Sequence, residues 1–128
     1  TELPSGTVTF LFTDIEGSTQ LWDKHPEAMK AALAKHDSIL KDAIESNHGQ
    51  IIKTTGDGVH AVFGTAIDGI NSAINAQRNL HSTFITHPSS FVFSQSTPAS
   101  PVSPVLQADY LLLSHLGSPF PIQIIIKY

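Results

Sequence analysis

Residues 49–63, GQIIKTTGDGVHAVF, decide the fold of this chain. Two short runs rich in β-branched residues, 50–55 and 59–63, flank a Gly-Asp-Gly triplet at 56–58. An Asp-Gly pair between two strand-like runs is a strong signal for a β-hairpin. The second run alternates, and we expect three of its side chains to face the core: Val59, Ala61 and Phe63.

A further strand is expected upstream, at Thr7 to Thr13 (TVTFLFT). Val8, Phe10 and Phe12 alternate along it, which is the pattern of a β-strand. Leu11 is apolar on the opposite side, so the pattern predicts a central strand covered on both faces.

A long helix is expected between the strand and the hairpin. Gly17 and Ser18 open a short turn, which Trp22 anchors. Pro26 then suits the first helical position, where a backbone N–H would have no partner within the helix. Gly49 suits a left-handed cap at the end. The apolar stripe falls at helical spacing on Met29, Leu33, His36, Leu40 and Ile44.

A second amphipathic helix is expected after the hairpin, ending at about Leu80. Thr65 with Asp68 three residues on predicts its N-terminal cap. The apolar stripe falls on Ile67, Ile70, Ile74 and Gln77 or Leu80. Among the histidines, we expect His36 to be a core residue with satisfied polar atoms and His60 to be solvated.

The order β-α-β-β-α comprises the first five elements of a ferredoxin-like α+β sandwich, which needs a fourth strand to follow. Candidate strands are Phe91 to Phe93 and Pro121 to Tyr128. Between them, residues 96–105 (STPASPVSPV) are rich in Pro and Ser, and we expect a loop or disorder. We therefore expect the fold to be incomplete at its C-terminal end.

The composition changes sharply near the end of the second helix. The first 80 residues hold ten of the eleven acids, whereas residues 81–128 hold six of the eight prolines. We divide the chain into a domain at 1–84 and an atypical Ser/Pro-rich tail at 85–128. Either a frame-shift or truncation near residues 81–86 produced the tail, or it evolved as a real cap; its sudden loss of charge favours the first.

Composition also excludes several classes. A net charge of −4 without a Lys/Arg cluster argues against nucleic acid or an anionic membrane as partner. The absence of cysteine excludes disulfides and thiolate metal sites. No apolar run is long enough to span a bilayer and no signal peptide is visible, so we expect a cytoplasmic protein. The first residue is Thr1, which suggests a processed or excised product.

Two carboxylates stand out at predicted strand ends. The hairpin topology places the end of the first strand beside the hairpin turn, so Asp14 should approach Asp57. Two close carboxylates repel unless a cation lies between them, and Mg²⁺ prefers one or two carboxylates plus phosphate oxygens. The loop from Ile15 to Thr19 offers free backbone N–H groups for phosphate. Taken singly, each Asp is also an ordinary turn or cap residue.

Two stretches now make a resemblance specific: LPSGTVTFLFTDIEGSTQLW at 3–22 and GQIIKTTGDGVHAVF at 49–63. Together they resemble the class III nucleotidyl cyclase catalytic domain, the adenylate/guanylate cyclase family, and bacterial members above all. The likeness covers residues 3 to about 80, in order and at the family's spacing.

The resemblance implies a role for each matching residue. Asp14 and Asp57 match the catalytic aspartates that bind two Mg²⁺ or Mn²⁺ ions, with the Ile15 carbonyl as a further ligand. Lys53 matches the lysine that recognises adenine, so ATP is the implied substrate. The turn that holds the triphosphate matches Ile15, Glu16, Gly17 and Ser18.

The family's chemistry also implies a partner. The ribose 3′-hydroxyl attacks the α-phosphate and pyrophosphate leaves, giving cyclic AMP by two-metal catalysis. An Asn and an Arg stabilise the transition state, and a second chain supplies them, in a homodimer or a heterodimer with another cyclase domain. After Leu80 this chain has neither Arg nor Asn. The resemblance thus predicts a chain that is weak or inactive alone.

Three alternatives stay open at this point. The first is an inactive pseudo-cyclase module that binds metal-nucleotide or a partner chain. The second is a haloacid-dehalogenase-type phosphatase, although Glu16 stands where its first motif has a second Asp, and the hairpin argues against its Rossmann-like order. The third is a diguanylate cyclase, whose Gly-Gly-Asp/Glu-Glu-Phe turn is not matched by the Thr-Gly-Asp-Gly-Val at 55–59.

Overall fold

A computed structural model describes residues 2–15, 17–86, 105–107, 110–114 and 122–127, with side chains as far as residue 83. Helices and strands follow in the order β1 (Thr9–Ile15), α1 (Ser18–Lys24), α2 (Pro26–Ser46), β2 (Gln50–Thr54), β3 (Val59–Phe63), α3 (Ala66–Thr86), β4 (Val105–Gln107), β5 (Tyr110–Ser114) and β6 (Ile122–Lys127). The predicted hairpin and both predicted long helices are confirmed. Within these residues, no helix is long and apolar enough to cross a membrane.

The strands form one antiparallel sheet in the order β2-β3-β1-β6-β5-β4. The ferredoxin-like α+β fold is confirmed, because β6 occupies the place beside β1 that the fourth strand of that fold takes. The predicted strand at 121–128 is therefore found as β6, whereas β4 and β5 were not expected. The candidate strand Phe91–Phe93 and all of the 96–105 segment except Val105 lie outside the described residues.

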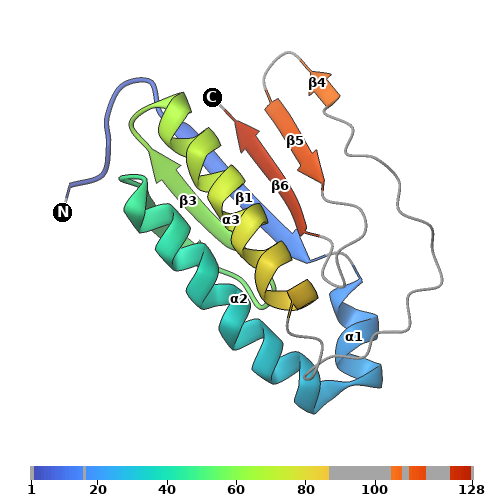
Figure 1. Ribbon diagram of the computed structural model, residues 1–128. Coiled ribbons are helices and arrows are strands. Elements are labelled where there is room, and N and C mark those ends of the chain that lie inside the picture. The colour runs from blue at the N-terminus through green and yellow to red at the C-terminus, as the bar shows by residue number, and fades with distance from the viewer. Residues whose placement is uncertain (1, 16, 87–104, 108–109, 115–121, 128) are drawn as a thin grey trace.

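Helices α2 and α3 lie side by side over one face of this sheet, and α1 lies at the end of β1 (Figure 1). The strand β1 has partners along both edges, so its central position is confirmed. Its cover on both faces is not: Leu11 and Ile15 are buried on the helix side, but Phe10 and Phe12 are only half-buried on the other side. Both helices pack on the same face, and no helix among the described residues covers the opposite face.

The pairing of β6 with β1 follows an apolar register. Ile122, Ile124 and Ile126 are paired with Ile15, Thr13 and Leu11, all of them buried residues of β1. Alternate residues of paired strands share a face, so these three isoleucines occupy positions that extend the buried face of β1. A β-branched strand therefore completes the sheet where the sequence left the fourth strand in doubt.

The predicted stripe of α2 is confirmed, but its end differs from the prediction. Met29, His36, Leu40 and Ile44 are buried and Leu33 is half-buried. The left-handed residue after the helix is His48, with φ 61°, and Gly49 has an ordinary backbone conformation. Gly49 serves close packing instead, because a Cβ there would lie 2.7 Å from Cζ of Phe63 and 2.8 Å from Cγ2 of Ile44.

The predicted stripe of α3 is wrong in part, and the helix continues to Thr86. Leu80 is buried and Ile70 packs against the core, as predicted. Ile67 and Ile74 are 60% and 37% exposed. The buried face consists of smaller residues with one leucine: Gly69, Ser72, Ala73, Ala76 and Leu80. A Cβ on Gly69 would lie 2.9 Å from Cγ2 of Thr9, so small residues let α3 approach β1 closely while Ile67 and Ile74 remain exposed.

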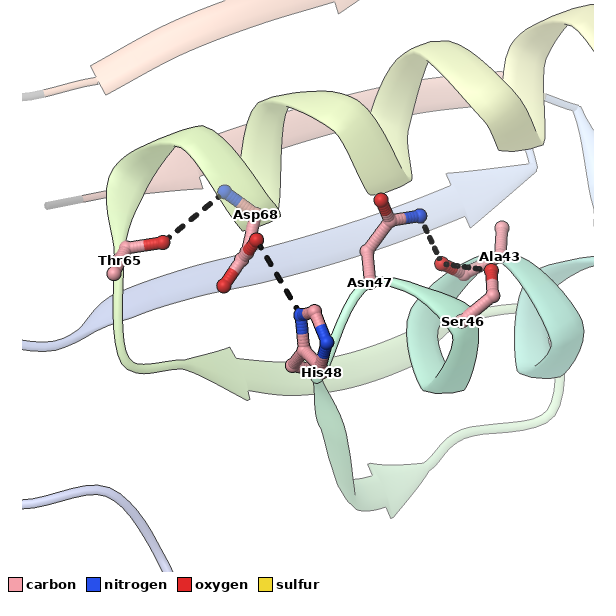
Figure 2. A network of polar contacts seen from close by, with 6 residues as sticks. All are labelled: Ala43, Ser46, Asn47, His48, Thr65 and Asp68. Carbon is pink, nitrogen blue, oxygen red and sulfur yellow. Dashed lines mark hydrogen bonds and ion pairs between the residues drawn. The ribbon is translucent and has the colours of Figure 1, made fainter.

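Polar contacts connect the end of α2 to the start of α3 (Figure 2). The predicted cap of α3 is confirmed, since the Asp68 N–H donates to Thr65 Oγ1 at 3.3 Å. The Asp68 carboxylate also lies 3.6 Å from Nδ1 of His48. His48 is 83% exposed, so this contact stabilises the fold little. At the end of α2, the Asn47 side chain donates to the Ala43 carbonyl at 2.7 Å.

The packing around Gly49 generates a stability prediction. Gly49→Ala should lower the free energy of unfolding by about 1–3 kcal/mol, because the added methyl group overpacks against Phe63. Gly56→Ala is the matched control: its added methyl group would meet no atom within 4 Å, so we expect a change within about 0.5 kcal/mol. Urea denaturation measures both. Equal effects would contradict the packing role of Gly49.

Candidate functional site

The site lies where the end of β1 meets the turn between β2 and β3. Asp14 is the second-last residue of β1 and is exposed, while Asp57 lies half-buried in the turn. The turn is closed by a hydrogen bond from the Thr55 N–H to the Gly58 carbonyl at 2.8 Å. Because β3 pairs with β1, the turn lies at the end of β1 that carries Asp14. The structure thus brings together the two aspartates that the sequence singled out.

The electrostatics of Asp14 reflect this proximity. Partial burial raises the pKa of Asp14 above its ordinary value of 3.8, and a hydrogen-bonding contact with Asp57 and its negative charge raise the pKa further. The Ile15 backbone N–H acts in the opposite direction. With a folded-state pKa above the unfolded value, Asp14 favours folding most below pH 3.8 and loses that contribution as pH rises through the folded value. At neutral pH that contribution of Asp14 is therefore absent.

Ser18 joins this pair from the start of α1. Its hydroxyl donates to Oδ2 of Asp57 at 2.6 Å, a charge-assisted hydrogen bond. The sequence predicted Ser18 as part of the phosphate turn and missed this bond. The sequence did show a hydroxyl in the loop after Asp14 that could form such a bond, but which acceptor it contacts depends on the rotamer of Ser18.

The remaining residues of the predicted phosphate turn, Ile15 to Gly17, do not form one uniform loop in the structure. Ile15 belongs to β1 and is 1% exposed, and Glu16 lies outside the described residues. Gly17 has φ 72°, a left-handed conformation that glycine adopts without strain, and precedes the first residue of α1. Leu21 packs against the core, whereas Trp22 is 37% exposed and anchors α1 less than predicted.

Lys53 lies on the face of the sheet that faces away from α2 and α3. It is exposed, and its cross-strand partner is His60, which is paired in turn with Phe12. The prediction that His60 is solvated is wrong: it is half-buried and its ring meets Phe12 edge-on, with centroids 4.8 Å apart. Asp14 alternates with buried Thr13 and Ile15, so it shares this outer face with Lys53.

His36 is a buried histidine within electrostatic reach of the site. It is 0% exposed; Nδ1 contacts Oδ1 of Asp37 at 2.9 Å, and Nε2 has no partner among the described residues. We expected both ring nitrogens to have hydrogen-bond partners, and only Nδ1 has one among the described residues. Burial lowers the pKa of His36, with Asp37 and Asp57 opposing it, so the imidazole is neutral and the Asp37 contact is a hydrogen bond.

The residues present fit a hard divalent cation. Two neighbouring carboxylates supply negative charge and oxygen ligands, and the charge of Asp57 is one of the causes that raise the pKa of Asp14. Among the described side chains there is no group of three or more His, Cys, Asp or Glu that could hold a metal by itself. A cation here would need further oxygens, as Mg²⁺ does when it binds with substrate phosphates.

Comparison with known proteins agrees with this geometry. The family model of the adenylate and guanylate cyclase catalytic domain matches residues 2–97. The chain belongs to this family. An adenylate cyclase of Podospora anserina is 37% identical over 67 residues, which is 52% of this chain and 3% of that protein. An uncharacterized protein of Mycobacterium tuberculosis is 41% identical over 78 residues, 59% of this chain and 27% of that protein.

Solved cyclase structures share the fold. The structure of a Trypanosoma brucei adenylate cyclase is 28% identical with a TM-score of 0.57, covering 62% of this chain and 36% of that chain. The adenylyl cyclase CyaB from P. aeruginosa has a TM-score of 0.61 over 94% of this chain and 93% of that chain. At 13% identity, this second likeness concerns the fold alone.

The proximity of the two aspartates can be tested by titration. Asp57→Asn should lower the pKa of Asp14 toward 3.8, since it removes the neighbouring charge while partial burial remains. Carboxyl ¹³C chemical shifts of labelled Asp14 followed against pH measure the change. Asp68→Asn is the control, because Asp68 contacts His48 and Thr65 instead, and should leave the Asp14 titration where it was.

Proposed function

We propose that this chain is the metal-binding half of a nucleotidyl cyclase site, which takes ATP with Mg²⁺ or Mn²⁺ and forms cyclic AMP and pyrophosphate once a second cyclase domain completes it. The observation that carries the proposal is the meeting of Asp14 and Asp57 at the end of β1. Membership of the cyclase family supports the same conclusion.

Each residue of the site has a proposed task. The carboxylates of Asp14 and Asp57 and the Ile15 carbonyl would hold two ions, and the residues from Ile15 to Ser18 would face the triphosphate. When bound, the ions would lower the pKa of the attacking 3′-hydroxyl and neutralise charge on the leaving pyrophosphate. The Ser18 hydroxyl orients the Asp57 carboxylate through the bond at 2.6 Å.

Recognition of the base and of the transition state would involve both chains. Lys53, exposed on the outer face of the sheet, would contact adenine. Residues 81–128 include no Arg or Asn, and a second cyclase domain would supply the donors that stabilise the transition state. Loss of such an arginine typically costs about 10³-fold or more in rate. A cytoplasmic location, which stays a prediction, would give the site access to ATP.

The second candidate is a module that binds metal-nucleotide or a partner chain without turnover. The missing Arg and Asn favour it over an enzyme that acts alone. A haloacid-dehalogenase-type phosphatase is not proposed, because the described strands pair only in antiparallel fashion. That class would need parallel strands joined by crossover helices.

Removal of one carboxylate tests the metal site. Asp57→Ala should abolish Mn²⁺-dependent binding of a fluorescent ATP analogue, because Asp14 alone offers too few ligands. The control is Asp42→Ala on the exposed side of α2, which should bind as the unmodified chain does. Circular dichroism checks that both variants are folded. Undiminished binding by folded Asp57→Ala would refute the site.

A mixing experiment separates the two candidate functions. The chain would be assayed with Mn²⁺-ATP alone and together with a complete cyclase relative in which both metal-binding aspartates are alanine. Cyclic AMP formed only in the mixture is the expected result, because the two chains together then hold one complete site. No product in the mixture, despite intact nucleotide binding, would favour the module without turnover.

A further inference from the structure

The regular pairing between β1 and β3 stops one residue before the site. The last matched pair is Phe12 with His60, and the next N–H of β3 belongs to Val59. That N–H donates to a side chain instead of a backbone carbonyl: its acceptor is Oγ1 of Thr13, at 2.9 Å, in a buried position. The Thr13 side chain is itself buried, with 5% of the residue exposed. At this position the Thr13 hydroxyl therefore replaces a backbone carbonyl as the hydrogen-bond acceptor for β3.

Gly58 makes a second close contact with the same residue. A Cβ on Gly58 would overlap the carbonyl oxygen of Thr13 and lie 3.1 Å from its carbonyl carbon. The same Cβ would lie 3.1 Å from Oγ1 of Thr55 across the turn. The backbone of the turn thus lies directly on the backbone of β1, and only a residue without a side chain permits this approach.

Both contacts flank the carboxylates in the sequence. Thr13 precedes Asp14, and Gly58 and Val59 follow Asp57. The contacts between Thr13 and the turn therefore fix the two backbones from which the carboxylates project. We propose that Thr13 is a positioning residue that sets the separation of Asp14 and Asp57, and thereby the affinity for a divalent cation. This inference rests on the proposed metal site.

The positioning role depends on the hydroxyl of Thr13 and not on the volume of its side chain. Valine has nearly the same shape but no acceptor, so in Thr13→Val the buried N–H of Val59 would lose its partner. A turn that moves to find another partner would carry Asp57 away from Asp14. Serine keeps the acceptor and loses only a methyl group.

The test measures Mn²⁺-dependent binding of a fluorescent ATP analogue to the full chain, because the site needs phosphate oxygens to hold the ion. It is carried out at a temperature where circular dichroism shows every variant folded. Thr13→Val should weaken this Mn²⁺-dependent binding by roughly 10- to 100-fold, the range for residues that orient metal ligands. Thr13→Ser should bind within about threefold of the unmodified chain if the orienting effect resides in the hydroxyl.

Thr9→Val is the matched control, because Thr9 is buried on the same face of β1 and lies far from the turn. It should leave the Mn²⁺-dependent binding unchanged. If Thr13→Val does not fold, Thr13→Ser and Thr13→Ala replace it, since both are smaller than threonine and differ only by the hydroxyl. Serine binding at least tenfold more tightly than alanine would then support the proposal.

Three outcomes overturn the inference. Equal Mn²⁺-dependent binding by Thr13→Val and the unmodified chain would remove the role of Thr13, while weakened binding by Asp57→Ala would keep the proposed function. Equal losses in Thr13→Val and Thr9→Val would point to general destabilisation. Unchanged Mn²⁺-dependent binding in Asp57→Ala would overturn the metal site itself, and the inference with it.

Discussion

The rest of the structure depends on the pairing of β1 along both of its edges. Its partners are β3 on one side and β6 on the other, and α2 and α3 cover one of its faces (Figure 1). A strand held in this way has little freedom to shift its register, because a slip by one residue would exchange its buried and exposed faces. The end of β1 is therefore a fixed point against which a turn can be placed.

Successive residues of a strand face opposite sides of the sheet, so neighbours at the end of β1 can have different roles. Ile15 and Thr13 are buried and hold β1 in place, while Asp14 between them is exposed beside Asp57. Partial burial and the nearby Asp57 both raise the pKa of Asp14, so the close approach of the two carboxylates is unfavourable. Perturbed pKa values cluster at functional sites, and the cation proposed to bind here would offset the repulsion between the carboxylates. Buried neighbours on either side of Asp14 allow the fold to tolerate that cost.

Local pattern predicted the elements well and the packing less well. The hairpin at 50–63, the central strand and the stripe of α2 follow from periodicity and turn chemistry, and the approach of Asp14 to Asp57 follows from the topology. The buried face of α3 did not follow, because the size of Gly69 mattered more than the hydrophobicity of Ile67 where the helix meets the sheet. The bond from Ser18 to Asp57 could not be predicted either, since it depends on a rotamer.

The C-terminal strand shows that completing a fold and completing a site make different demands on a sequence. The place beside β1 needs a β-forming segment whose alternate residues are apolar, and β6, IQIIIK, meets this demand through pattern alone. Many unrelated sequences could do the same. A donor for a transition state must instead be one residue type at one position, because its charge and its reach are what matter. A chain can therefore retain the cyclase fold and the carboxylate pair on β1 and the hairpin without carrying those donors itself.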